Sequence, residues 1–110
     1  MDTATARTRL EDMLCDLDRS ISILTGQHPG FDMHPADAGA SLTDADRAEA
    51  AVEAMERQRS AVLAALRRLE NGVYGRCVDC GQPVSEGRLD ARPDAARCVI
   101  CQGKYDKTQH

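Results

Sequence analysis

The chain contains few aromatic residues. Among its 110 residues there is no Trp, only one Phe and two Tyr. A thick globular core usually relies on aromatic side chains, because each of them buries a large area. The hydrophobic share is 42%, but much of it is Ala, which fills little volume. We therefore expect a thin, mostly two-layer structure that needs a local staple.

Long apolar runs are also missing. No run approaches the length of about 18 residues that a membrane-spanning helix needs, so no membrane association is expected. The first residues, MDTATARTRLEDML, lack the apolar stretch of a signal peptide. We therefore expect a cytoplasmic protein. In that compartment the five Cys are more readily metal ligands or reactive thiols than disulfides.

The sequence has no excess of positive charge. Its formal net charge is −4, with 13 acidic residues and 8 Arg before position 72. This balance argues against direct, sequence-specific DNA binding, which depends on cationic contacts to phosphate. A chain of this size also leaves little volume for a substrate pocket, so we do not expect an enzyme.

Residues 4–25 are predicted to form an amphipathic helix. Thr3 or Thr5 is a candidate N-cap, and Gly26 is a candidate helix stop. The apolar residues recur at spacings of 4, 3, 4 and 3, as in a heptad seam. They are Leu10, Leu14, Leu17, Ile21 and Leu24.

A second, longer helix is predicted over residues 44–71. Ser41 with Asp44, or Thr43 with Asp46, is its candidate N-terminal cap. Arg59 interrupts its apolar seam, although its long stem can pack while its head reaches water. The seam consists of Ala48, Val52, Met55, Val62, Leu66 and Leu69, and the Asn71-Gly72 pair signals the end of the helix.

Residues 26–43 separate the two helices and contain three Gly and two Pro, so they are predicted to be a loop. The matching seams predict that residues 1–71 fold as an antiparallel coiled-coil hairpin with its tip near 26–43. The alternative is a pair of helices from a small bundle. No other long apolar face exists to complete such a bundle, which favours the hairpin.

Gly, Pro and Cys mark residues 72–110 as a second unit, ending in a short closing helix over residues 99–107. Its strongest signal is Cys77-Val-Asp-Cys80, followed after 17 residues by Cys98-Val-Ile-Cys101. Two such pairs are typical of a four-cysteine zinc site that holds one ion. Because four protein ligands leave no open position, the ion is expected to be structural, supplying folding energy that a small core lacks.

A redox pair is the alternative for these cysteines, but no strand–helix–strand pattern surrounds them. Cys15 remains outside the constellation. It lies next to the seam position Leu14 and is expected to be a packed or half-buried free thiol.

Residues 72–102 resemble the zinc-finger signature of the DksA/TraR family of bacterial transcription regulators. The matching pieces are G-x-Y-G-x-C-x-x-C-G, R-L-x-A-x-P and C-x-x-C-Q. The resemblance implies a mainly α-helical protein, with a coiled-coil hairpin followed by a small C-terminal zinc finger of the four-cysteine type. It also implies binding to RNA polymerase, insertion of the hairpin through the secondary channel, and altered transcription initiation, often together with the alarmone ppGpp.

The family places acidic residues at the hairpin tip in the pattern D-x-x-D-x-A. Asp46-Arg47-Ala48 matches the second half of this pattern, with Thr43 at the first Asp position and Asp44 one place away. His34-Pro35-Ala36-Asp37 is the second candidate, since it resembles a segment of shorter relatives. Asp37, Asp44 and Asp46 are therefore candidate polymerase-contacting residues. The alternative is that these acids only cap helices or complement a helix dipole.

We thus expect a monomeric regulator that binds RNA polymerase. The alternative is a zinc-stapled adaptor that binds another protein without entering the channel. Tyr74 is expected to pack the hairpin against the zinc unit, and Arg88, Leu89 and Pro93 to organise the loop between the cysteine pairs. Arg92 and Arg97 are expected either to contact the polymerase or to form a solvated face.

Overall fold

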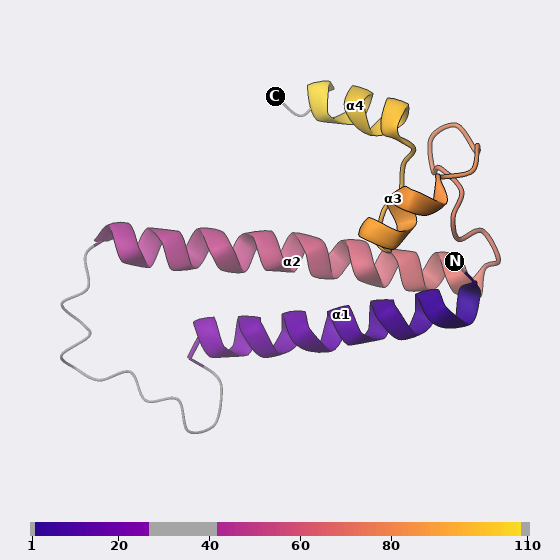
Figure 1. The fold of residues 1–110 in the computed structure, drawn as a ribbon. Helices are drawn as coiled ribbons and strands as arrows, with labels where there is room; N and C mark the ends of the chain where they lie inside the picture. The colour runs from indigo at the N-terminus through magenta and orange to yellow at the C-terminus, as the bar shows by residue number, and fades with distance from the viewer. Residues whose placement is uncertain (1, 27–41, 109–110) are drawn as a thin grey trace.

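The structure is a computed structural model that describes residues 2–26 and 42–108, with side chains from position 46 onward in the second range. Its described part is mainly helical and contains no named strand, which confirms the predicted fold class (Figure 1). The helices are α1 (Thr3–Leu24), α2 (Leu42–Glu70), α3 (Glu86–Ala91) and α4 (Val99–Thr108).

The two long helices lie side by side and run in opposite directions, as the hairpin prediction requires (Figure 1). With 29 residues, α2 is roughly 43 Å long at 1.5 Å per residue. The end of α1 and the start of α2 lie at one end of this hairpin, and α3 lies beside the other end of α2. We call the end beside α3 the base of the hairpin.

The first helix begins one residue earlier than predicted. Asp2 is its N-cap, and the carboxylate accepts a hydrogen bond of 2.7 Å from the Thr5 backbone N–H. The predicted caps Thr3 and Thr5 are therefore wrong, because both residues lie inside the helix. A carboxylate satisfies a free N–H at a helix start at least as well as a hydroxyl does. Gly26 ends the helix as predicted, with a φ of 73°.

The second helix begins at Leu42, two residues earlier than predicted. Thr43 therefore lies within it and is not its N-cap, while Ser41 lies outside the described residues, as does most of the predicted 26–43 loop. The predicted stop is confirmed at the other end. The Gly72 N–H donates to the Leu69 carbonyl and the Val73 N–H to the Arg68 carbonyl, at a Gly72 φ of 74°. This Schellman pattern needs the left-handed backbone that glycine adopts readily.

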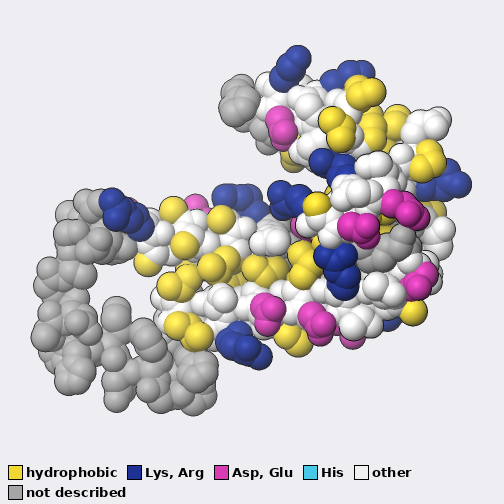
Figure 2. Space-filling view, viewed as in Figure 1, with side chains coloured by type: hydrophobic (Ala, Val, Ile, Leu, Met, Phe, Trp, Pro, Cys, Tyr) yellow, Lys and Arg dark blue, Asp and Glu magenta, His cyan; other side chains and the backbone are white. Residues whose placement is uncertain are grey.

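The hairpin core is concentrated at the base. Met13, Leu14, Leu17, Leu66 and Tyr74 pack around it, and yellow side chains fill the gap between the helices in Figure 2. Ala65 and Ala6, which the seams missed, belong to this core because small side chains let the helices approach closely. Its buried members are Ala6, Leu10, Val62, Ala65 and Leu69.

Burial falls off away from the base. Leu17, Ile21, Val52 and Met55 are half-buried, and Leu24 is 42% exposed. The prediction that Leu24 belongs to the buried seam is therefore wrong, since two helices without a third layer enclose a seam incompletely. Arg59 keeps its head accessible as predicted, but it also bonds across the seam, with Nε 2.6 Å from Asp18 Oδ1.

The remaining elements follow the hairpin. The closing helix α4 matches the predicted range 99–107 to within one residue. The helix α3 was not predicted, because six residues are too short to reveal a helical period. Its local signal is Ser85, whose hydroxyl caps it by accepting from the Arg88 N–H at 3.3 Å.

None of the described helices has both the length and the apolar character that crossing a membrane demands.

We predict that Leu10→Ala destabilises the hairpin strongly. Leu10 is fully buried, and a buried Leu→Ala substitution typically costs about 2–5 kcal/mol. Urea unfolding followed by circular dichroism at 222 nm measures the loss. Leu24→Ala is the matched control and should cost less than about 1 kcal/mol because Leu24 is exposed. Equal losses for the two variants would contradict the placement of the core at the base.

Candidate metal centre and its attachment to the hairpin

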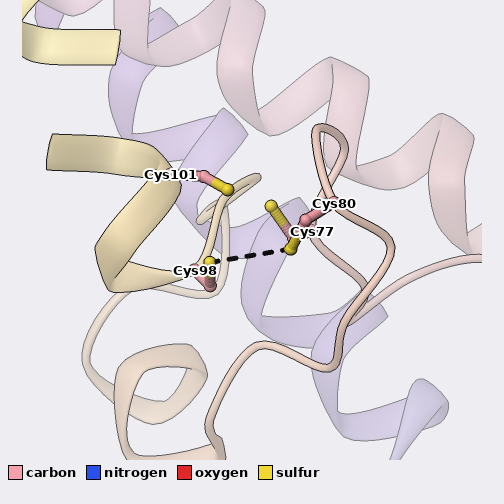
Figure 3. A group of neighbouring side chains, drawn as sticks. All are labelled: Cys77, Cys80, Cys98 and Cys101. Atoms are coloured by element: carbon pink, nitrogen blue, oxygen red, sulfur yellow. Dashed lines mark hydrogen bonds between the residues drawn. The ribbon is translucent and has the colours of Figure 1, made fainter. Parts of the chain in front are cut away.

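Four cysteines converge beside the base of the hairpin. Cys77 and Cys80 come from the turn that follows α2, Cys98 immediately precedes α4, and Cys101 lies in the first turn of α4. Figure 3 shows their side chains pointing toward one another. All four Sγ atoms lie within 4.8 Å of one another, and those of Cys80 and Cys98 are 3.9 Å apart.

This spacing fits a tetrahedral zinc ion. A zinc–sulfur distance of about 2.3 Å places the ligands of a tetrahedral site about 3.8 Å from each other. The Cys80–Cys98 separation is close to that value, and the remaining separations need only small side-chain shifts. Four soft sulfur donors can fill every coordination position, so the arrangement suits a structural ion rather than a catalytic one.

Backbone hydrogen bonds build the first cysteine turn. The Gly81 N–H donates to the Cys77 carbonyl at 3.0 Å, and Gly81 has a φ of 76° that favours glycine. The Cys77 N–H donates to the Gln82 carbonyl at 2.8 Å. The Val78 N–H donates to the Ala96 carbonyl at 2.9 Å, which joins this turn to the segment before Cys98. Two local hydrogen bonds and one between positions distant in the sequence therefore set the sulfur positions.

The surroundings of the four cysteines favour deprotonation of one thiol and disfavour deprotonation of all four at once. Burial raises the pKa of Cys77, but backbone N–H donors from Cys80, Cys98 and Asp79 outweigh this effect and lower the pKa to about 6. Hydrogen bonds with the side chains of Cys98 and Cys77 raise the pKa of Cys101 to about 12. Four negative sulfurs this close together require a cation to replace the protons that they otherwise share.

Tyr74 joins the cysteine unit to the hairpin, as predicted. Its ring packs against both the hairpin core and a second buried cluster formed by Cys77, Val84 and Leu89. Its hydroxyl donates to the Pro93 carbonyl at 2.8 Å. One aromatic residue therefore packs against two small cores. This sharing compensates for the small number of aromatic residues in the chain.

The loop between the cysteine pairs is organised as predicted. Leu89 is 5% exposed and fills the second cluster. Arg88 Nε donates to the Arg97 carbonyl at 2.9 Å, so the loop is fixed just before Cys98. Arg9 of α1 donates to the Asp90 carbonyl at 2.7 Å and ties the loop to the hairpin a second time.

Of the two roles predicted for Arg97, the solvated face is wrong, whereas contact with the polymerase stays a prediction. Its Nε lies 2.7 Å from Asp79 Oδ2, and its guanidinium carbon stacks 4.0 Å from the centre of the Tyr105 ring. The residue therefore links the first cysteine turn to α4 rather than forming a solvated face. Arg92, with a 63% exposed side chain, remains available to solvent or a partner.

A cleft of about 450 Å³ lies between the cysteine unit and α2. Its basic side chains belong to Arg88, Arg92 and Arg97, and its acidic ones to Asp94 and Asp106. Blue arginine side chains border the same side of α2 in Figure 2. Asp94 is 6% exposed, and nothing in the neighbouring sequence indicates that this carboxylate is buried.

The candidate tip acids are not brought together by the described structure. Asp37 lies outside the described residues. Asp44 belongs to the first turn of α2, with a side chain outside the described set, and Asp46 is exposed on the next turn.

Cys15 is exposed, so the expectation of a packed or half-buried thiol is wrong. The residue lies outside the seam formed by its neighbours.

Comparison with known proteins supports the zinc-finger interpretation. Residues 72–107 match the family model described as the prokaryotic dksA/traR C4-type zinc finger, which confirms the resemblance for that segment. The chain is also 40% identical over 57 residues to the RNA polymerase-binding transcription factor DksA of Caulobacter vibrioides strains NA1000 / CB15N and ATCC 19089 / CIP 103742 / CB 15. This match covers 49% of the chain and 40% of the length of each relative.

Two solved structures share the fold over almost the whole chain. The transcription factor DksA2 from Pseudomonas aeruginosa matches with a TM-score of 0.66 at 20% identity, covering 97% of this chain and 81% of that one. The RNA polymerase binding protein and transcriptional regulator Dks from Chlamydia trachomatis matches with a TM-score of 0.64 at 20% identity, covering 97% and 90%. The hairpin with an attached cysteine unit is thus a known architecture.

Proposed function

We propose that this protein is a cytoplasmic regulator that binds RNA polymerase and modulates transcription initiation without being an enzyme. The observation that carries this proposal is the 40% identity over 57 residues to RNA polymerase-binding transcription factors. The fold shared with the two solved structures, over 97% of the chain, is compatible with it. In this proposal residues 1–71 form the unit that enters the secondary channel, and residues 72–110 form the zinc finger.

The shape of the hairpin supports entry into a channel. It is only two helices thick and its longer helix extends for roughly 43 Å, so it can reach a site that a globular domain cannot. The cysteine unit lies at the base (Figure 1) and would remain outside as an anchor. Three apolar side chains within the cysteine pairs, Val78, Val99 and Ile100, are 49–71% exposed and are available for contact with a protein surface.

We assign one structural zinc ion to Cys77, Cys80, Cys98 and Cys101. The ion would supply the cross-link that the small second cluster needs, because metal binding to thiolates contributes folding free energy. The chain's own contribution is to hold the sulfurs within 4.8 Å of one another. It does so through the turn at Gly81 and the Val78–Ala96 hydrogen bond.

Asp37, Asp44 and Asp46 are the proposed contacts at the inserted end. Carboxylates delivered near catalytic Mg²⁺ change the local charge and the position of substrate. Asp46 is exposed near the start of α2, at the end of the hairpin away from the cysteine unit. This location suits a tip role, whereas Asp46 is too far into the helix to act as its N-cap.

The alarmone ppGpp is a further proposed partner. Guanidinium groups bind phosphate well, and Arg92, whose side chain is 63% exposed, borders the cleft beside α2.

Binding as a monomer is expected, since each proposed contact comes from one chain. Direct, sequence-specific DNA binding is not part of the proposal, because the net charge of −4 disfavours it.

For the metal, Cys77→Ser should lower bound zinc from about one ion per chain to near zero, because a four-ligand site loses a thiolate. Elemental analysis after gel filtration measures zinc, and circular dichroism follows the loosening of residues 72–110. Cys15→Ser is the matched control and should keep its zinc, since that thiol is remote from the cluster. Full zinc retention in Cys77→Ser would contradict the assignment.

For the partner, the zinc-loaded protein should co-purify with core RNA polymerase, and a transcript-cleavage factor that occupies the secondary channel should displace it. No binding at micromolar concentration would overturn the proposal. Binding without competition would favour the alternative, a zinc-stapled adaptor that stays outside the channel.

For the tip, Asp37→Asn and the double variant Asp44→Asn/Asp46→Asn should change transcript yield several-fold while polymerase affinity stays nearly constant. The reason is that the tip acts at the active centre while the rest of the molecule supplies most of the contact. In vitro transcription, with and without ppGpp, measures the effect. Asp16→Asn on α1 is the matched control. Loss of thermal stability with unchanged transcription would identify the tip acids as helix caps only.

A further inference from the structure

The side chain of Arg97 connects the two cysteine pairs. Its Nε lies 2.7 Å from Oδ2 of Asp79, which belongs to the first Cys-x-x-Cys turn. Its guanidinium carbon lies 4.0 Å from the centre of the ring of Tyr105, which follows Cys101 by one turn of α4. Only 23% of the Arg97 side chain is exposed. We call this arrangement, in which Asp79 and Tyr105 hold one guanidinium between them, the Arg97 bridge.

Backbone contacts fix the point from which this side chain starts. The Arg97 carbonyl accepts a hydrogen bond of 2.9 Å from Arg88 Nε. The preceding carbonyl, that of Ala96, accepts one of 2.9 Å from the Val78 N–H in the first cysteine turn. The backbone at Arg97 is therefore held against that turn, which keeps the guanidinium within reach of Asp79.

The helix α4 depends on this bridge because it has little packing of its own. Among the described helices only α1 and α2 pack against each other, and none of the residues of α4 is buried. Val99 and Ile100 at its start are 67% and 71% exposed. The contacts that join α4 to the cysteine unit include Cys101, which packs on the second buried cluster, and the Tyr105 ring. The position of a helix that carries one of the four sulfurs therefore depends partly on Arg97.

The same guanidinium borders the open side of the four sulfurs. Cys77 is buried and Cys98 and Cys101 are half-buried, whereas Cys80 is exposed. A hollow of about 440 Å³ lies on this side, and its lining includes Cys80, Cys101, Arg97 and Tyr105. A chelator that removes an ion from the cluster therefore has an open path along this hollow, past the Arg97 bridge.

The charge of Arg97 also acts on the site. Four thiolates around one dication leave a net negative charge, and a guanidinium beside them offsets part of it. A partly exposed ion pair adds little to folding stability, and the Asp79 side chain is 46% exposed. The effect of Arg97 is therefore expected mainly on the retention of the ion rather than on the unfolding of the chain.

We propose that Arg97 is a positioning residue that retains the ion of the proposed zinc site, on which this inference rests. It holds the two cysteine pairs together through Asp79 and Tyr105 and covers the side from which the ion is lost. Replacing residues just outside a metal's ligands typically costs about 10–100-fold in affinity. Arginine suits this role because its flat guanidinium can stack on a ring and bind a carboxylate at the same time, whereas an ammonium group is a compact point charge.

The rate of zinc loss tests the Arg97 bridge. The zinc-loaded full chain is mixed with an excess of the coloured chelator 4-(2-pyridylazo)resorcinol, well below the unfolding midpoint. Arg97→Met should release zinc about 10–100-fold faster than the wild type. Arg97→Lys keeps the charge but loses the flat stacking surface, so its rate should lie closer to that of Arg97→Met than to that of the wild type. An unchanged rate in Arg97→Met, or full rescue by Arg97→Lys, would overturn the proposal.

A variant on the other side of the bridge keeps the test valid if Arg97→Met does not fold. Tyr105→Leu removes the stacking partner and should also speed zinc release. Combined with Arg97→Met, it should bring no further acceleration, because both changes break the same bridge. Independent, multiplying accelerations would count against a single bridge.

Two controls separate the bridge from charge and from global stability. Arg92→Met makes the same chemical change at a side chain that is 63% exposed, and it should alter the rate by less than about twofold. Leu10→Ala weakens the hairpin without touching the cysteines and should leave the rate near that of the wild type. Acceleration in either control equal to that of Arg97→Met would overturn the bridge.

The release rates also separate this proposal from the proposed function. A wild-type chain that binds no zinc would overturn the zinc site and the bridge together. Zinc binding with unchanged release in Arg97→Met would overturn the bridge alone. Neither measurement involves RNA polymerase, so the bridge and the regulatory function can fail separately.

Discussion

The closure of two cysteine turns onto one point is the constraint on which the rest of the protein depends. Residues 72–108 contain too few large apolar side chains to fold around a core of ordinary size, and their buried cluster has only Cys77, Val84 and Leu89 at its centre. With four sulfurs within 4.8 Å of one another, a metal cross-link can replace the missing core. The Val78–Ala96 hydrogen bond and the Arg97–Asp79 ion pair join the two cysteine turns.

The closed unit in turn completes the hairpin. A pair of helices buries its seam poorly, and among the side chains that the structure describes the fully buried ones lie near the base, where Tyr74 packs against them. Away from the base the same kind of apolar residue becomes half-buried and then exposed, ending at Leu24. This gradient is compatible with the proposed function, in which the far end of the hairpin would enter a channel while the base would stay outside.

The junction between the hairpin and the cysteine unit is small, but its contacts hold the two units together. Tyr74 and Arg9 both cross it, and they combine an apolar contact with two hydrogen bonds to backbone carbonyls. Directional contacts of this kind fix an angle, whereas apolar packing alone permits sliding. For a protein that would engage one large partner with both of its ends, the angle between those ends matters as much as their individual surfaces.

The sequence by itself determined the features that depend on local spacing. These are the two long helices, the stops at Gly26 and Gly72, the closing helix and the pairing of four cysteines, because helical period and cysteine spacing are written in neighbouring residues. The tertiary structure alone decided which residues meet across long separations. It placed Arg97 on Asp79 and Tyr105 and buried Asp94. No one-dimensional pattern encodes these two outcomes, since each depends on which residues distant in the sequence come together when the cysteine unit folds.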